Sequence, residues 1–192
     1  MEELKTLVNR LSPLPDSDFE ALKALFQKRT VKKKGFVQIE NNLVNEIHYV
    51  PNGNYRGYIN KDGEEITTHF YFGPTFLADY LSYKTKQRTK HNIQAFQDGI
   101  YYSANFDELE ALGETSLPLT RFFLKFFQAV YLYKEQRAVS FVNDSPEERY
   151  LNFFKIRPKV IEQMPLKYIA SYLGMTPETL SRIRNKIRFS EE

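Results

Sequence analysis

Residues 165–187 contain two short amphipathic helix patterns joined at a single glycine, and this arrangement constrains the fold more than any other feature of the chain. The first pattern follows Pro165, which is tolerated at a helix start, and places four apolar residues on one helical face. These residues are Leu166, Ile169, Ala170 and Leu173. Gly174 comes next, at a sharp reversal where the left-handed backbone conformation is accessible mainly to glycine. We therefore predict a helix-turn-helix.

The second pattern begins with the N-cap residue Thr176, a proline in the first turn, and Glu178 near the positive end of the helix dipole. Leu180, Ile183 and Ile187 continue the apolar stripe, so the polar side chains face away from the core. Such side chains suit DNA, because Arg can bond guanine, Asn adenine and Glu cytosine, while Ser, Thr and Lys bind phosphates. The predicted DNA-contacting residues are Thr176, Glu178, Thr179, Ser181, Arg182, Arg184, Asn185 and Lys186. The alternatives are a hairpin with an ordinary solvated face and a module whose C-terminal helices contact a protein partner.

The charge of the chain is distributed unevenly. Residues 145–192 carry nine Lys and Arg against six Asp and Glu, whereas residues 1–144 carry equal numbers of the two signs. The net charge of +3 therefore lies in the last quarter of the chain. Although the excess is small, it favours DNA phosphates as the partner of these helices.

Composition excludes several classes of function. The chain of 192 residues has no cysteine, which excludes disulfides, thiolate metal sites and thiol catalysis. Its three histidines lie far apart, and no phosphate-binding loop or nucleophile motif is present, so we expect neither enzyme activity nor a cofactor or metal site. The N-terminus lacks a signal-peptide pattern, and no stretch approaches the roughly 18 apolar residues of a membrane span. We expect a cytoplasmic protein with no membrane partner.

Between residues 36 and 103 the apolar period changes to about two. Runs rich in aromatic and β-branched residues are separated by the hairpin signals Asn52-Gly53 and Asp62-Gly63. Regularly spaced short strands of this kind indicate an antiparallel barrel or sandwich. Helical patterns precede them at residues 16–27 and follow them at residues 106–112. The fold class that we predict is α+β.

A longer helix is predicted from Leu117 to Gln136. Its apolar residues span more than one face, so one face can cover the β-domain and another can pair with a second copy. Burial against its own domain alone is the alternative. We expect a hinge at residues 142–144, followed by a capping box at residues 145–148 that begins the C-terminal helices.

In this order of β-domain, long helix and C-terminal helix-turn-helix, the chain resembles the Crp/Fnr family of bacterial transcription regulators. The resemblance covers nearly the whole chain. It is most specific at residues 76–95 (FLADYLSYKTKQRTKHNIQA), 145–150 (SPEERY) and 165–183 (PLKYIASYLGMTPETLSRI).

The resemblance implies a division of the chain into three parts and a set of binding partners. These are a cyclic-nucleotide-binding-like antiparallel β-roll sensor domain with flanking helices at residues 1–115, a dimerisation helix and hinge at 116–141, and a DNA-binding domain at 142–192. A homodimer on palindromic double-stranded DNA is also implied, with RNA polymerase as a further partner. The family usually adds a wing hairpin after the recognition helix. Here the sequence after Arg188 is short, so we expect a shortened or absent wing.

The chain departs from the family at the ligand cassette. Members that bind cyclic nucleotides hold the ribose with a Gly-Glu pair and the phosphate with an Arg-Ser/Thr pair. The residues that resemble these pairs are Ala78 with Asp79 and Arg88 with Thr89. Asp79 is shorter than Glu and Ala78 adds a methyl group, whereas Arg88 and Thr89 retain groups that can bind phosphate. We therefore expect an effector other than cyclic AMP, or none; a retained cyclic-nucleotide response is the alternative.

Overall fold

The computed structural model describes residues 1–190, with side chains through Ile187. The strands are β1 (Gln27–Val31), β2 (Phe36–Gln38), β3 (Glu46–Val50), β4 (Asn54–Lys61), β5 (Glu64–Phe72), β6 (Thr75–Leu77), β7 (His91–Ala95) and β8 (Gly99–Asn105). They form two four-stranded antiparallel sheets, in the orders β1-β8-β3-β6 and β2-β7-β4-β5. Gly53 and Gly63 have φ values of +90° and +85°, as the predicted turns require. The predicted α+β class and the antiparallel β-roll are confirmed.

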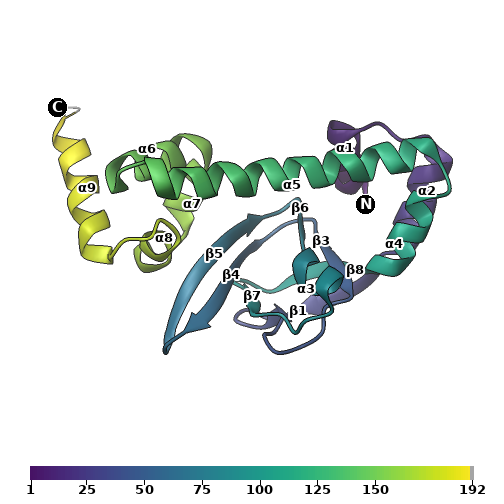
Figure 1. Ribbon diagram of the computed structural model, residues 1–192, viewed down its shortest axis with the longest axis horizontal. Helices are drawn as coiled ribbons and strands as arrows, with labels where there is room; N and C mark the ends of the chain where they lie inside the picture. The colour runs from purple at the N-terminus through teal and green to yellow at the C-terminus, as the bar shows by residue number, and fades with distance from the viewer. Residues whose placement is uncertain (191–192) are drawn as a thin grey trace.

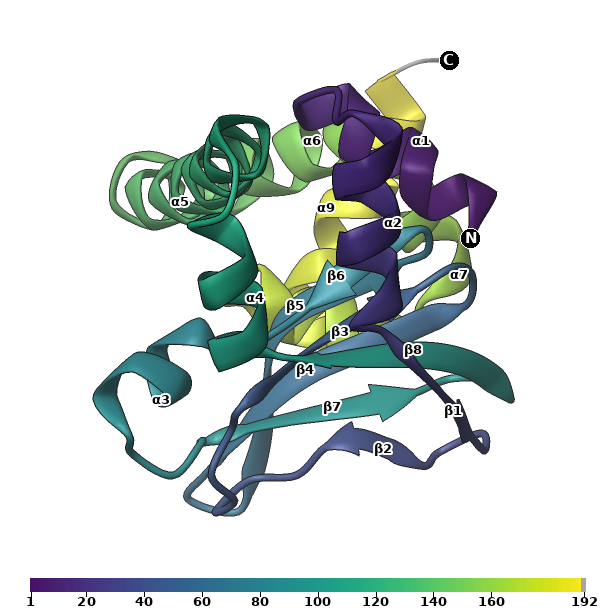
Figure 2. The same ribbon diagram turned by 90° about the vertical axis from the view of Figure 1, so that its right-hand side faces the viewer.

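The helices of residues 1–143 are α1 (Glu2–Leu11), α2 (Asp16–Ala24), α3 (Tyr80–Thr85), α4 (Phe106–Gly113) and α5 (Leu117–Asn143). Leu4, Leu22 and Leu119 are at most 2% exposed and share one core with Tyr49 of β3, so α1, α2 and the start of α5 pack on the first sheet. Figure 2 shows α1, α2 and α5 together on one side of the strands. Within the described residues, none of the helices is both long and apolar enough to cross a membrane.

The long helix α5 ends later than the sequence predicted. We expected it to stop near Gln136 and a hinge to occupy residues 142–144, but the helix continues to Asn143 and Asp144 is its C-cap. No helix-breaking residue lies between Gln136 and Asn143. The last turns also gain contacts with the C-terminal helices, because Arg137 donates a hydrogen bond to the carbonyl oxygen of Tyr172 at 2.9 Å.

The C-terminal helices lie at one end of α5, and the N-terminal helices lie at the other (Figure 1). They are α6 (Pro146–Ile156), α7 (Pro158–Gln163), α8 (Leu166–Tyr172) and α9 (Pro177–Ser190). Ser145 and Glu148 form the predicted capping box at the start of α6. Helix α9 extends to Ser190, the last residue that the structure describes, so the expected shortened or absent wing is not tested; residues 191–192 and the Arg188 side chain lie outside the described part.

The C-terminal helices also pack on the second sheet. Phe70 of β5 is 4% exposed, and its ring centroid lies 5.3 Å from that of Tyr172 on α8. Arg157 donates a hydrogen bond to the carbonyl oxygen of Phe70 at 2.9 Å. The hydroxyl of Ser171 accepts one from the N–H of Thr67 at 2.9 Å. The helix-turn-helix is therefore attached to both the long helix and the β-roll.

Candidate DNA-binding helix and effector site

Buried residues on both helices and the glycine between them hold the helix-turn-helix together. Ala170 of α8 and Leu180 of α9 are 0% exposed, so the helices approach each other closely. Gly174 adopts φ +67°, the left-handed conformation that the sequence predicts. A Cβ atom at this position would lie 2.6 Å from a ring carbon of Phe141 on α5. Glycine is thus needed both for the turn and for the approach of the turn to α5.

Thr176 and the apolar stripe fix the orientation of α9. The Thr176 hydroxyl accepts a hydrogen bond from the N–H of Thr179 at 3.2 Å, which is the predicted N-cap. Ile183 is 9% exposed beside Leu180, and Ile187 packs against the same core. The buried face of α9 is therefore the one that the sequence predicted. The opposite face of the helix must point to solvent.

Glu178, Arg182 and Asn185 form the centre of that opposite face. Helical spacing places them together, away from Leu180, and all three side chains are exposed. Ser181 and Lys186 are exposed at the two edges of this face. Arg184 is also exposed, but it follows Leu180 by four residues and therefore lies next to the buried stripe. The structure thus gathers most of the predicted DNA-contacting residues on one face, with Arg184 at its border.

Local contacts organise the charged groups of this face. Arg182 donates a hydrogen bond to the Thr179 hydroxyl at 3.4 Å, and Lys186 pairs with Glu147 of α6 at 2.7 Å. Hydrogen bonds from its own backbone N–H and from Thr176 lower the pKa of Glu178. The Glu178 side chain is therefore a carboxylate at neutral pH and can only accept hydrogen bonds.

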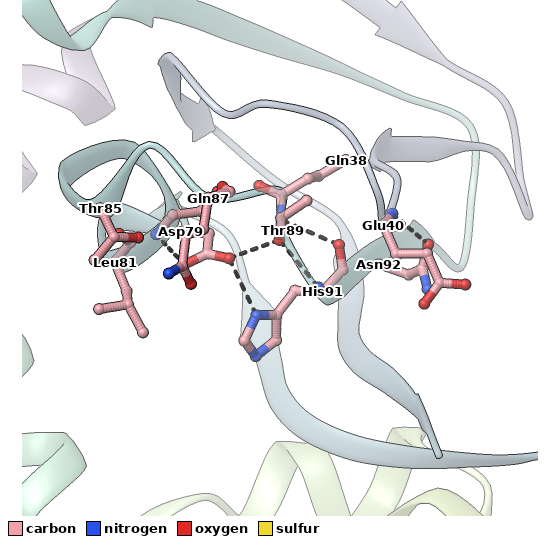
Figure 3. A network of polar contacts seen from close by, with 10 residues as sticks. Gln38, Glu40, Asp79, Leu81, Thr85, Gln87, Thr89, His91 and Asn92 are labelled. Atoms are coloured by element: carbon pink, nitrogen blue, oxygen red, sulfur yellow. Dashed lines mark hydrogen bonds and ion pairs between the residues drawn. The ribbon is translucent and has the colours of Figure 1, made fainter. Parts of the chain in front are cut away.

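Asp79 lies at the centre of the predicted effector site. Its side chain caps α3 by accepting a hydrogen bond from the N–H of Ser82 at 3.2 Å. The Thr89 hydroxyl donates to it at 2.6 Å, and Nδ1 of His91 donates at 3.2 Å (Figure 3). Burial alone would raise the pKa of Asp79, but the hydrogen bonds from His91 and Thr89 outweigh it and lower this pKa to about 2. The carboxylate is ionised and surrounded by donors of the protein itself.

The two halves of the predicted cassette come together only in part. Thr89 is 1% exposed and also accepts a hydrogen bond from Gln38 at 3.1 Å. Arg88, in contrast, is exposed and donates to the carbonyl oxygen of Asn41 at 2.6 Å. Ala78 is half-buried and packs against the core of the N-terminal helices. The structure thus joins Asp79 and Thr89, but it directs Arg88 to a different partner.

The sequence analysis did not identify His91 and Gln38 as partners of Asp79 and Thr89.

It also did not identify the aromatic side chains of β5 that pack against α5. The His69 ring stacks on Tyr71 of the same strand, with centroids 5.5 Å apart, and lies 6.3 Å from the Tyr133 ring on α5. Burial lowers the pKa of His69 to about 3, so its imidazole is neutral. Side chains alternate between the two faces of a strand, so His69 and Tyr71 of β5 lie on the same face. This spacing was the only feature of the sequence that could have predicted their contact.

A further missed residue is Arg56 of β4. It is 0% exposed, pairs with Glu65, and lies between the rings of Tyr58 and Tyr168 at 4.2 and 3.8 Å from their centroids. Because Tyr168 belongs to α8, this stack joins the β-roll to the helix-turn-helix. The sequence around Arg56 does not indicate a contact with Tyr168, which lies more than one hundred residues away.

No protein-family model matches the chain, and no curated protein sequence matches it either. Solved structures do match over most of its length. A CooA variant from Carboxydothermus hydrogenoformans superposes with a TM-score of 0.70 at 15% identity, covering 88% of this chain and 79% of the other. FixK2 from Bradyrhizobium japonicum gives 0.69 at 16% identity, covering 86% of both chains. A crp/fnr family transcriptional regulator from Eubacterium rectale gives 0.67 at 18% identity, covering 92% and 85%. The fold of this chain is therefore that of the Crp/Fnr regulators.

Proposed function

We propose that the chain is a sequence-specific DNA-binding transcription regulator of the Crp/Fnr type. The observation that carries this proposal is the exposed polar face of α9, centred on Glu178, Arg182 and Asn185 and held outward by the buried Leu180. These side-chain types can read base edges in the major groove. The positive excess of the C-terminal residues adds attraction to phosphates.

Selection of bound sequences from random duplex DNA tests the proposal. Arg182→Ala should weaken binding to the selected site by about 1–3 kcal/mol and relax the preference at one base pair. Arg10→Ala on α1 is the matched control, because it removes an exposed arginine from the N-terminal helices, at the other end of α5. Affinity should also fall steeply with salt. Equal affinity of Arg182→Ala and the parent would refute the assignment of Arg182 as a base-reading residue. Binding that salt does not weaken would favour a protein partner.

We further propose a homodimer formed along α5. Leu124, Tyr131 and Val142 are 57%, 63% and 85% exposed and recur at spacings of seven and eleven residues, which align on one side of a helix. A second copy would cover this apolar face and place two recognition helices on a palindrome, with half-sites roughly 34–36 Å apart.

Sedimentation analysis distinguishes the dimer from a monomer. Leu124→Glu with Val142→Glu should convert a dimer into monomers, since two carboxylates would be buried without partners. Leu81→Glu is the control, because Leu81 is 68% exposed on α3 and lies off this face. A parent chain that is monomeric at micromolar concentration would refute the proposed seam.

We propose that the effector is not cyclic AMP. The polar groups of Asp79 and Thr89 already bond to His91, Gln38 and each other, and Arg88 is directed elsewhere. Proteins of this fold differ in what they respond to: one structural neighbour is described as a c-di-GMP responsive global regulator, and CprK is described in complex with OCPA. A ligand of other chemistry is consistent with this variety.

A further inference from the structure

A second cavity lies away from the cassette, where the last turns of α5 meet α6 and the end of α8. Its volume is about 430 Å³, within the range of small-molecule sites. Aromatic and aliphatic side chains form much of its wall, and they come from all three helices. These are Tyr133, Phe141, Phe153, Ile156, Tyr172 and Leu173.

The polar part of the wall is strongly cationic. It contains Arg137, Arg149, Lys155 and Arg157 but only one carboxylate, that of Asp144. The Asp144 carboxylate accepts hydrogen bonds from neutral groups, Ser140 at 2.6 Å and Asn152 at 3.4 Å. Among the side chains that the structure describes, none of the four cations belongs to an ion pair. Four cations against one carboxylate leave an excess of positive charge beside the apolar walls.

The two arginines nearest the turn retain free donor capacity. Arg137 donates to the Tyr172 carbonyl oxygen at 2.9 Å, while its Nε is buried without a hydrogen-bond partner. Its guanidinium lies 4.4 Å from the Tyr172 ring centroid. Arg149 donates to the carbonyl oxygens of Leu173 and Asp144 at 3.0 and 2.6 Å. Since a guanidinium has five N–H donors, these contacts orient both groups and leave donors for an anion.

The cavity is separate from the proposed dimer seam. Its α5 residues include Tyr133, Arg137 and Phe141, spaced by four residues on the side of α5 that faces the C-terminal helices. The exposed apolar residues Tyr131 and Val142 lie outside the cavity lining. A second copy on α5 would therefore leave this cavity accessible.

We propose that this cavity binds a small aromatic anion, with its ring between the aromatic walls and its carboxylate or phosphate on Arg137, Arg149 and Lys155. Arg137 and Arg149 donate hydrogen bonds to the carbonyl oxygens of Tyr172 and Leu173, the last residue and the C-cap of α8, immediately before Gly174. A bound anion would bridge α5 and α6 at this point and fix the helix-turn-helix relative to the long helix. Its effect on DNA affinity rests on the proposed function, but the binding itself does not.

Calorimetric titration of the full chain with phenyl phosphate tests the site without DNA. We expect saturable binding with a dissociation constant of about 1 mM or below, the range for a ligand of about a dozen non-hydrogen atoms. Benzyl alcohol, which lacks the anion, and inorganic phosphate, which lacks the ring, should each bind at least about tenfold more weakly. Equal binding of inorganic phosphate, or no saturation with phenyl phosphate by about 10 mM, would overturn the proposal.

Variants locate the binding. Lys155→Gln should weaken phenyl phosphate about tenfold without disturbing the fold, because Lys155 is exposed. Arg137→Gln should weaken it further while keeping a donor for the Tyr172 carbonyl. Lys159→Gln, an exposed lysine on α7 outside the lining, is the matched control. Binding that survives in both Lys155→Gln and Arg137→Gln would place the ligand elsewhere and refute this site.

Measuring DNA affinity with and without phenyl phosphate separates the ligand site from the proposed function. With the ligand present, affinity for the selected DNA should change at least about threefold in the parent and not in Lys155→Gln. Ligand binding in a chain that binds no DNA would leave the site intact and refute the regulator. Ligand binding with unchanged DNA affinity would refute the coupling through α8.

Discussion

The stack of Arg56 between Tyr58 and Tyr168 predicts how firmly the helix-turn-helix is attached to the β-roll. The arginine side chain is 0% exposed, and its Nε and Nη1 atoms have no hydrogen-bond partners. Glu65 provides the ion pair, but its own side chain is 47% exposed, so solvent screens that interaction. The faces of the two rings therefore supply much of the compensation for the buried charge.

Replacement of Tyr168 by leucine removes one of these faces while keeping apolar bulk on α8. A desolvated cation–π contact contributes about 2 kcal/mol. Lys167 lies 4.9 Å from the centroid of the same ring, but it is exposed and adds at most about 1 kcal/mol. We expect Tyr168→Leu to lower the free energy of unfolding by about 2–3 kcal/mol. Tyr168→Phe keeps the π face over Arg56 at 3.8 Å and should cost less than about 0.5 kcal/mol.

Denaturant unfolding measures the loss, and amide hydrogen exchange locates it. Exchange in α8 should accelerate about thirtyfold in Tyr168→Leu if the helix detaches from the β-roll by local opening, since about 2 kcal/mol corresponds to that factor. The core of α1, α2 and β3 serves as the internal control and should exchange as in the parent. The reasoning is refuted if the leucine and phenylalanine variants are equally stable, because the ring face would then contribute nothing.

Three further predictions concern the turn, the titration of a buried histidine and the effector. Gly174→Ala should destabilise by about 1–2 kcal/mol for the left-handed backbone alone, and more if the Phe141 ring must move, as a thermal denaturation midpoint would reveal; an unchanged midpoint would contradict the close approach of Phe141 to this turn. Burial lowers the pKa of His48, which is 5% exposed and bonded to Ser103 at 2.8 Å, to about 4, so the unfolded chain binds more protons below pH 6.5 and stability falls as the pH falls from there towards 4. This histidine should account for about 2 kcal/mol of the difference in unfolding free energy between pH 7 and pH 5, and His48→Gln should lose that share of the pH dependence, whereas an unaltered pH profile would exclude the assignment. Cyclic AMP should show no saturable binding at micromolar concentration by calorimetry; binding that Arg88→Ala abolishes would mean that Arg88 turns back into the cassette.

The sequence was sufficient for the helix-turn-helix because each of its determinants is local. Gly174 follows its apolar stripe directly, Thr176 caps a backbone N–H three residues away, and Ser145 pairs with Glu148 in the same way. Periodicity likewise identified the strands and the buried face of α9, since a period of two or 3.6 residues states which side chains turn inward. The length of α5 was underestimated because its last turns are held by Arg137 and Phe141 against residues of the turn, which lie more than thirty positions along the chain.

The partners of the inward and polar side chains were decided only by the tertiary structure. Asp79 bonds to Thr89 and His91, while Arg88, next to Thr89 in sequence, donates to the carbonyl oxygen of Asn41. Tyr168 of α8 stacks on Arg56 of β4, and Arg137, Arg149, Lys155 and Arg157 line one cavity. Periodicity states that a side chain faces the interior, but a hydrogen bond or an aromatic stack also depends on which distant segment packs against it. That choice is made by the packing of the whole chain and leaves no local pattern in the sequence.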